Sequence, residues 1–251
     1  MNHFTLDKQV ILFDEGDSVM MAARKAGVHI PHLCWHPDLG QSGACRVCTV
    51  KIDGRLAAAC TTRAAPDMMV ENRTGELDDK RRLLLQMLFV EGNHFCPGCE
   101  KSGDCLLQET AYEVGMKGPH FEEFYPKRPL DASHPDTWID FDRCILCKLC
   151  VRASREVDQK DVFAIGGHGI GTHLLIDSPT GKLGDSAFSA DDFAAGVCPV
   201  GAILPKRRGF VIPIHERRFD RSSLDEEARA RVSAVPTADA QQPDGDKDVD
   251  A

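Results

Sequence analysis

The eleven cysteines of this 251-residue chain constrain its fold more than any other feature. An odd number of cysteines cannot pair completely in disulfides, and clustered cysteines in a reducing compartment are more often metal ligands or reactive thiols. Along the sequence the cysteines fall into groups of four, three and four. No cysteine remains outside these groups, and the middle group lacks a fourth ligand. The groups are Cys34, Cys45, Cys48 and Cys60; Cys96, Cys99 and Cys105; and Cys144, Cys147, Cys150 and Cys198.

The last group has the most specific spacing. Three thiolates at Cys144-x2-Cys147-x2-Cys150 can cover one face of a cubane while the distant Cys198 reaches the opposite corner, as in bacterial ferredoxins. Zinc sites usually bring cysteines in separated pairs. Ser154 stands where a two-cluster ferredoxin would carry a further cysteine. We therefore expect one [4Fe-4S] cluster here, with zinc as the alternative.

The first group resembles a different kind of cluster site. Cys34, Cys45 and Cys48 lie in one loop, and Cys60 comes from a later predicted strand. Plant-type [2Fe-2S] ferredoxins follow the same logic, although their first spacing is four residues where this chain has ten. We expect a [2Fe-2S] cluster at these four cysteines, against a zinc site built on the single Cys-x2-Cys pair.

The sequence around the first group predicts a small module of strands and one helix. Residues 4–13 read as two short strands around a polar turn, and Asp17 is placed to cap a helix that Gly27 ends. The Asp-Gly dipeptide at 53–54 favours a tight hairpin. This order of elements suits a β-grasp fold over residues 1–75.

The middle group needs a fourth ligand. Cys96, Cys99 and Cys105 follow a predicted helix and lie between two iron–sulfur motifs, with His94 just ahead of them. Three thiolates and a histidine can also hold zinc. We expect a [4Fe-4S] cluster bound by His94 and these cysteines, with Asp104 as the fourth ligand or a three-iron cluster as the alternatives.

These patterns divide the chain into four segments of an α+β protein. The [2Fe-2S] module of residues 1–75 precedes a helical segment, residues 76–120, with the site of one histidine and three cysteines. A ferredoxin-like [4Fe-4S] domain follows at 121–210, and a charged, flexible tail at 211–251. From Ser222 onward the acidic, proline-bearing composition predicts no packed structure.

The balance of charge narrows the possible partners. Lysine and arginine number 30 against 39 acidic residues, a net charge of −9, which argues against a nucleic-acid surface. The most apolar run, residues 83–90, is too short to cross a bilayer, and charge interrupts the start of the chain where a secretory signal would be apolar. We expect a cytoplasmic protein with protein partners and no membrane insertion.

The order of the three cysteine motifs is similar to that of a known family. It resembles the N-terminal part of the large iron–sulfur subunit of respiratory complex I, and the accessory domains of some iron-only hydrogenases. The segment EGNHFCPGCEKSGDCLLQ, residues 91–108, is similar to the iron–sulfur diaphorase subunit of soluble NAD-reducing nickel–iron hydrogenases. Complex I relatives carry their histidine four residues before the first cysteine, where this chain has Gly92.

This resemblance implies a non-catalytic electron-transfer subunit of a hetero-oligomeric oxidoreductase. Single electrons would pass through one [2Fe-2S] and two [4Fe-4S] clusters. The implied partners are an FMN- and NADH-binding diaphorase subunit and nickel–iron hydrogenase subunits. An NAD-linked formate dehydrogenase or a complex I-like assembly is the nearest alternative. A zinc-stapled assembly scaffold is the alternative from another class.

Overall fold

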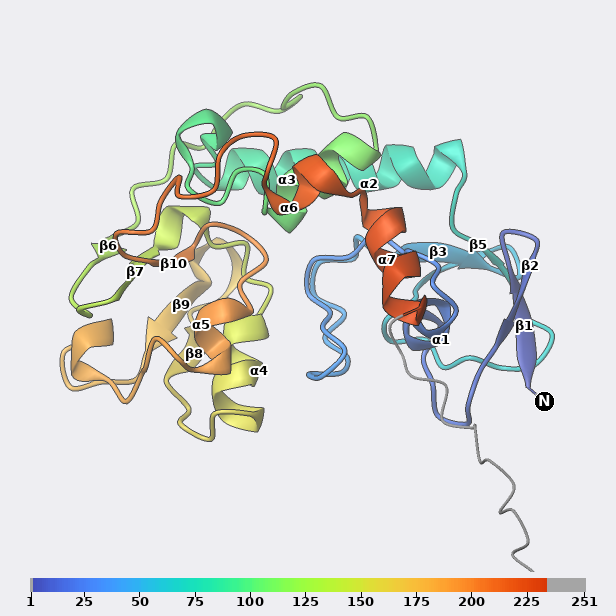
Figure 1. Cartoon of the computed structure of the whole chain (residues 1–251), viewed down its shortest axis with the longest axis horizontal. Coiled ribbons are helices and arrows are strands. Elements are labelled where there is room, and N and C mark those ends of the chain that lie inside the picture. The colour runs from blue at the N-terminus through green and yellow to red at the C-terminus, as the bar shows by residue number, and fades with distance from the viewer. Residues whose placement is uncertain (1, 234–251) are drawn as a thin grey trace, which may run out of the picture.

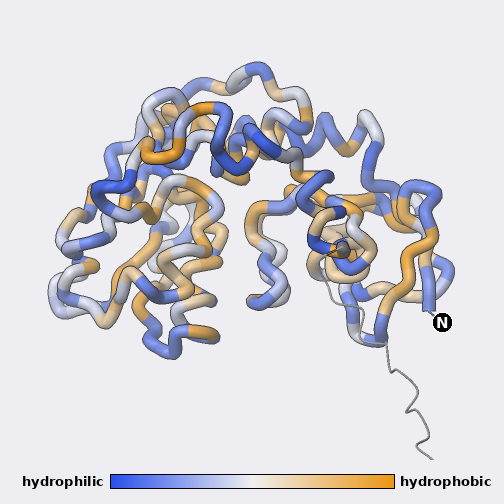
Figure 2. Tube along the Cα trace, viewed as in Figure 1, coloured by the Kyte–Doolittle hydropathy of each residue, from blue (hydrophilic) through white to orange (hydrophobic). Residues whose placement is uncertain are grey.

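A five-stranded sheet and one helix form the N-terminal lobe of the computed structural model, which describes residues 2–233. The sheet order is β2-β1-β5-β3-β4, and β1 and β5 run parallel while the other pairs are antiparallel. Apolar residues gather along its strands (Figure 2). The strands are β1 (His3–Leu6), β2 (Gln9–Leu12), β3 (Thr49–Ile52), β4 (Arg55–Ala58) and β5 (Met69–Glu71).

Both hairpins of this sheet have the turns that the sequence predicts. Asp7 and Lys8 have φ of 48° and 72°, and Asp53 and Gly54 have φ of 48° and 79°. Two consecutive left-handed residues are the signature of the tight turn that matches strand twist. The expected hairpins are therefore confirmed.

Helix α1 (Val19–Lys25) packs its buried face against the sheet, but its cap is not the predicted one. Ser18 accepts a hydrogen bond from the amide of Met21 at 3.1 Å. The prediction of Asp17 as the cap is wrong because the helix begins one residue later, and the Asp17 carboxylate pairs with Lys25 at 2.8 Å. Gly27, with φ of 71°, ends the helix as expected.

Helix α2 (Gly75–Glu91) spans from the N-terminal lobe to the second lobe (Figure 1). Its buried Arg81 fixes it to the sheet by donating to the carbonyls of Val47 and Thr49 at 3.2 and 3.0 Å. Gly92 ends the helix in an extended conformation. The 3-10 turn η1 (Cys96–Gly98) and helix α3 (Leu106–Glu113) follow.

The second lobe contains two small sheets. The order of the first is β10-β7-β6, and β8 and β9 form an antiparallel hairpin. Helix α4 packs against α5 and β8. The elements are β6 (Leu130–Asp131), β7 (Thr137–Asp140), η2 (Phe141–Arg143), α4 (Leu149–Glu156), β8 (Phe163–Gly166), η3 (Gly169–Gly171), β9 (His173–Ile176), η4 (Leu183–Asp185), α5 (Phe193–Gly196) and β10 (Ile203–Pro205).

Two helices follow β10 and correct the expectation of an unstructured tail. After α6 (Arg218–Arg221), α7 (Leu224–Ser233) lies beside α1 (Figure 1). Leu224 is buried, and Asp225 pairs with Arg73 at 2.6 Å. The expectation from Ser222 onward is wrong for α7, because partners on distant elements supply burial and charge pairing that local composition cannot show.

Residues 234–251, the rest of the expected tail, lie outside the described part of the chain. No helix within residues 2–233 is long and apolar enough to cross a membrane.

Candidate metal centres

The β3–β4 hairpin presents two cysteines of the first group side by side. Thr49 pairs with Ala58 at the open end of the hairpin, so Cys48 and Cys60 continue the two strands just beyond. Their Sγ atoms lie 3.3 Å apart. The short turn of this hairpin therefore fixes half of the first candidate site.

The other two thiols of the first group come from the preceding loop. The amide of Cys45 donates to Sγ of Cys34 at 3.3 Å. The neighbouring Cys45 thiol and the amides of Cys45 and Ala44, acting against burial, lower the pKa of Cys34. Amide dipoles directed at sulfur stabilise a thiolate, which is the form that binds iron.

The middle group surrounds one buried cavity with His94. The cavity is lined by His94 and the three cysteines, together with Phe89, Phe95, Ser102, Leu107, Gln108, Arg143 and Gly201. The Nε2 atom of His94 is buried and has no hydrogen-bond partner within residues 2–233. Buried polar atoms are nearly always paired, so this nitrogen is suited to bind a metal in the cavity.

Three local structures bring the middle group together. The amide of Asn93 donates to the carbonyl of Asp142 at 2.9 Å, which anchors the chain after α2. The 3-10 turn η1 folds Cys99 back on Cys96, whose carbonyl accepts from the Cys99 amide at 3.1 Å. Cys105 stands at the N-terminus of α3. Each ligand candidate is thus held by backbone hydrogen bonds or by a helix end.

The electrostatics of the middle group favour a neutral imidazole. Burial, then the charges of Arg143 and Arg128, lower the pKa of His94 to about 4. Burial raises the pKa of Cys105 to about 12. Neutral imidazole is the form that binds metals, and a buried thiol becomes a thiolate when a metal supplies positive charge.

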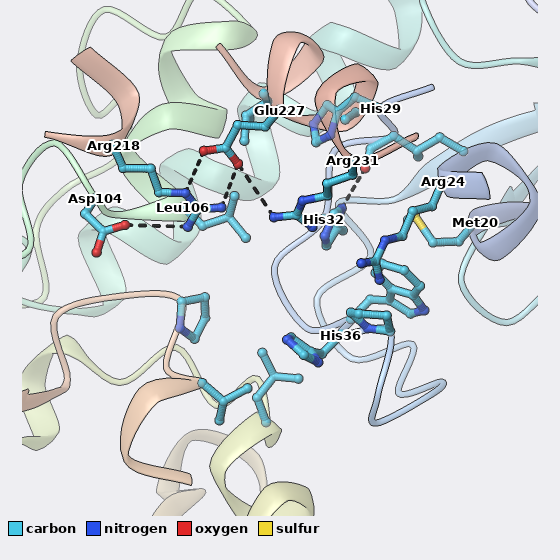
Figure 3. Close-up of a pocket in the computed structure, with 18 of the residues that line it drawn as sticks. Met20, Arg24, His29, His32, His36, Asp104, Leu106, Arg218, Glu227 and Arg231 are labelled. Atoms are coloured by element: carbon cyan, nitrogen blue, oxygen red, sulfur yellow. Dashed lines mark hydrogen bonds and ion pairs between the residues drawn. The ribbon is translucent and has the colours of Figure 1, made fainter. Parts of the chain in front are cut away.

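Asp104, the alternative fourth ligand, has other partners. It pairs with Lys101 at 2.6 Å and with Arg218 at 3.5 Å. Arg218 also binds Glu227 of α7 at 2.7 Å (Figure 3). These residues line a separate cavity of 750 Å³ beside the loop that carries His32 and His36.

The third group encloses an apolar cavity. Cys144, Cys147, Cys150 and Cys198 line it with Leu146, Ile165, Leu174, Val200 and Ile203, among others. The backbone amides of Leu146, Leu149 and Val151 act to lower the pKa values of Cys144, Cys147 and Cys150 in turn.

Left-handed residues shape this loop, and burial controls its thiols. Leu146 and Lys148 have φ of 53° and 64°. The backbone is therefore left-handed on both sides of Cys147. Burial raises the pKa of Cys144 to about 11 and the pKa values of Cys147 and Cys150 well above the ordinary range. These thiols also need a bound metal to become thiolates.

The third group borders both of the others. Cys34 of the first group packs in the same buried cluster as Cys147 and Cys150. Cys105 of the middle group packs in a cluster that Cys144 and Cys198 also touch. The three candidate sites are therefore adjacent in the fold, although the third is last in sequence.

The described residues hold no set of three or more His, Cys, Asp or Glu side chains arranged around a single metal ion. In a cubane each thiolate binds a different iron, so its ligands need not converge on one point. The donor sets, with four thiols, three thiols and an imidazole, and four thiols, have the chemistry of iron–sulfur ligands.

Arg143 is a functional candidate that the sequence does not reveal. Its side chain lies 3.6 Å from the thiol of Cys99, although it is adjacent in sequence to Cys144 of another group. No local pattern predicts this direction, because the contact spans 44 residues.

Three family models match successive parts of the chain. A 2Fe-2S iron-sulfur cluster binding domain matches residues 1–75, and the NADH-ubiquinone oxidoreductase-G iron-sulfur binding region matches 81–120. A 4Fe-4S single cluster domain matches 137–204. The expected order of a [2Fe-2S] domain followed by [4Fe-4S] domains is confirmed.

A curated relative decides the family. The gamma subunit of the NAD-reducing hydrogenase HoxS of Cupriavidus necator is 38% identical over 221 residues, which cover 88% of this chain and 94% of the relative. The chain belongs to this HoxS gamma family. The similarity to the diaphorase subunit that the sequence suggests is thus confirmed, and so is the expectation of an iron–sulfur protein.

Two further comparisons agree with membership of the HoxS gamma family. A solved structure of NAD+-reducing [NiFe]-hydrogenase in the H2-reduced state contains a chain that is 52% identical. The match covers 91% of this chain and 98% of that one, with a TM-score of 0.87. The mitochondrial 78 kDa subunit of NADH-ubiquinone oxidoreductase of Candida albicans is 30% identical over 82% of this chain but only 29% of its own length. The similarity to that larger protein is therefore confined to one part of it.

Proposed function

We propose that this chain relays single electrons between an FMN- and NADH-binding subunit and the nickel–iron hydrogenase subunits of an NAD-reducing hydrogenase. One [2Fe-2S] and two [4Fe-4S] clusters carry the electrons. The observation that carries the proposal is the adjacency of the three candidate sites, in which the third group packs against the first and the middle groups. Family membership agrees with this role.

Bound clusters supply one-electron chemistry, and the chain supplies the surroundings. Hydride exchange with a nicotinamide requires a flavin and a dinucleotide site, so it belongs to a partner subunit. Apolar residues such as Leu174 and Val200 exclude water from the third site. The amide of Cys45, which donates to the sulfur of Cys34, stabilises negative charge on that atom.

The proposed ligands are the eleven cysteines and His94. Cys34, Cys45, Cys48 and Cys60 hold the [2Fe-2S] cluster. His94 completes the middle site, and its unpaired, buried Nε2 supports this assignment over Asp104, which already has two cationic partners within the described residues. Cys144, Cys147, Cys150 and Cys198 hold the second [4Fe-4S] cluster.

The proposed domains follow the cluster sites. Residues 1–75 form a β-grasp domain, supported by the mixed five-stranded sheet that α1 covers. Residues 76–120 form the helical segment with the histidine and three cysteines, and 121–210 form the ferredoxin-like domain. From residue 211 the chain is a C-terminal extension that includes α6 and α7.

The test is the composition of the complex purified without oxygen. We expect this chain to account for about ten iron atoms with matching acid-labile sulfide, in addition to the iron of the nickel–iron subunits. Co-purifying subunits should contain flavin and nickel. Molybdenum or tungsten in place of nickel would identify a formate dehydrogenase as the terminus. One zinc ion and only about six iron atoms in this chain would show that zinc occupies one of the two proposed [4Fe-4S] sites. Zinc at all three sites would favour the scaffold alternative.

A further inference from the structure

Arg143 connects the two candidate [4Fe-4S] sites. Its backbone precedes Cys144 of the third group, and its guanidinium points to the middle group, with Nη1 3.6 Å from Sγ of Cys99. The same nitrogen lies 3.0 Å from the carboxylate of Glu100. The side chain of Arg143 is only 17% exposed, so this charge acts with little screening by water.

Surrounding groups fix the guanidinium in this position. Its Nε pairs with Asp140 at 2.8 Å, and its Cζ lies over the ring of Trp138, 5.2 Å from the ring centroid. The carbonyl of Gly201 accepts from Nη1 at 3.4 Å. A guanidinium with partners on several sides is held in one geometry, so its Nη1 already points toward the Cys99 sulfur before the cluster is reduced.

Gly201 makes the close approach possible. A Cβ atom at this position would lie 2.8 Å from Sγ of Cys99 and 3.6 Å from Nη1 of Arg143. Any larger residue would therefore push against the thiol that Arg143 contacts. The chain after Cys198 passes the middle site at a point where only glycine fits.

We propose that Arg143 is a positioning residue that raises the reduction potential of the middle [4Fe-4S] cluster above the value its ligands alone would give. The inference rests on the proposed function, because it requires a cluster at His94 and Cys99. The cluster takes up one electron from its neighbour, and no bond forms or breaks. A cation and an N–H donor at a ligand sulfur stabilise the added negative charge, which makes reduction easier.

The effect should be largest at the middle cluster because charge interactions weaken with distance. Glu100 and Asp140 offset part of the positive charge. Removal of Arg143 would leave both carboxylates near the cluster without their cation. The loss of the positive charge of Arg143 and the exposure of the cluster to two unneutralised carboxylates both make the reduction potential more negative.

The variants Arg143→Gln and Glu100→Gln test the proposal by the opposite signs of their effects. Arg143→Gln should move the midpoint potential of the middle cluster to more negative values. Glu100→Gln removes a carboxylate and should move it to more positive values. Arg143→Lys keeps the charge but loses the planar fork, so its shift should be negative and smaller. Arg155→Gln is the control, because Arg155 pairs with Asp161 on the surface of α4.

The measurement is a potentiometric titration of the anaerobically purified complex, followed by the EPR signals of its clusters. Opposite shifts for Arg143→Gln and Glu100→Gln, with Arg155→Gln unchanged, would support the proposal. If Arg143→Gln loses iron, a positive shift in Glu100→Gln still supports it, and an unchanged potential there overturns it. Intact clusters with unshifted potentials in Arg143→Gln overturn it as well. A wild-type complex without the middle cluster would instead refute the proposed function itself.

Discussion

At the scale of single residues, the middle site depends on one imidazole that lacks a protein partner within the described residues. His94 is buried, its pKa is lowered to about 4, and its Nε2 forms no hydrogen bond there. A buried nitrogen left unpaired costs on the order of 1–3 kcal/mol, so a ligand role removes a penalty that a merely structural role would keep.

Replacement of His94 by cysteine or alanine should separate ligation from packing. His94→Cys, if its shorter side chain reaches iron, should keep about four irons at the site and lower their potential, since a thiolate adds negative charge. His94→Ala should lose iron there. Iron analysis and EPR-monitored titration measure both. His120→Ala, at an exposed histidine, is the control, and wild-type behaviour of both His94 variants would leave Asp104 as the next candidate.

Gly201→Ala should disturb the same site through its contact with Cys99. The added Cβ would lie 2.8 Å from Sγ of Cys99, closer than real contacts allow. We expect a cost of about 1–3 kcal/mol in stability and partial loss of the middle cluster. Gly118→Ala, where a Cβ meets nothing within 4 Å, is the matched control for thermal unfolding and iron content. Equal effects of the two substitutions would contradict the close approach.

At the scale of elements, ion pairs hold α3, α7 and the chain before α2 together. Glu113 of α3 lies 3.3 Å from His29 and 3.2 Å from Arg73, which also binds Asp225 of α7 at 2.6 Å. Burial acts to raise the pKa of Glu113, but the proximity of His29 and the charge of Arg73 outweigh it, and the pKa is lowered.

Glu113→Gln should therefore destabilise the protein at neutral pH. A lowered carboxyl pKa gives stability that is fully present above the unfolded value of about 4.3 and is lost as pH falls through the folded pKa. Neutral pH lies above that window. We expect a loss of about 1–3 kcal/mol, seen as earlier thermal bleaching of the clusters. Glu122→Gln, at an exposed glutamate, is the control, and identical bleaching curves would contradict the role of Glu113.

Removal of α7 should weaken the fold around the first candidate site. A chain ending at Ser222 lacks α7, whereas a chain ending at Ser233 keeps it. The shorter chain loses the ion pairs of Asp225 with Arg73 and of Glu227 with Arg218, and the buried Leu224. We expect it to bleach at a lower temperature than the longer chain. Equal bleaching would show that α7 adds no stability.

Sequence reasoning succeeded where structure depends on near neighbours. The hairpins at Asp7-Lys8 and Asp53-Gly54 and the helix end at Gly27 follow from the conformations that those residues favour. The packing of α7 could not be predicted, because its burial and its pairing with Arg73 depend on residues far away in sequence.

The candidate sites divide in the same way. The grouping of the cysteines follows from spacing alone, and the structure brings His94 to the cavity of the middle group. The contact of Arg143 with Cys99 depends on how two segments pack, so no pattern in the sequence indicates it. The adjacency of the third group to both others is also a product of the tertiary fold.

At the scale of the whole molecule, the fold packs the third donor set in buried clusters shared with the first and with the middle donor set. An electron relay needs such adjacency because each cluster must lie close to the next one for an electron to pass between them. A zinc-stapled scaffold would use the same ligands, but its bound zinc would not be reduced. Reducibility is therefore the property that separates the two accounts.

The most direct measurement is EPR spectroscopy of the complex, purified without oxygen and then reduced by NADH or by H2. The account predicts that either reductant produces the signals of one [2Fe-2S] and two [4Fe-4S] clusters in this chain. Serine substitutions at Cys48, Cys99 and Cys147 should each remove a different signal. A complex that contains this chain in full amount but shows none of these signals with either reductant would contradict the electron-relay account.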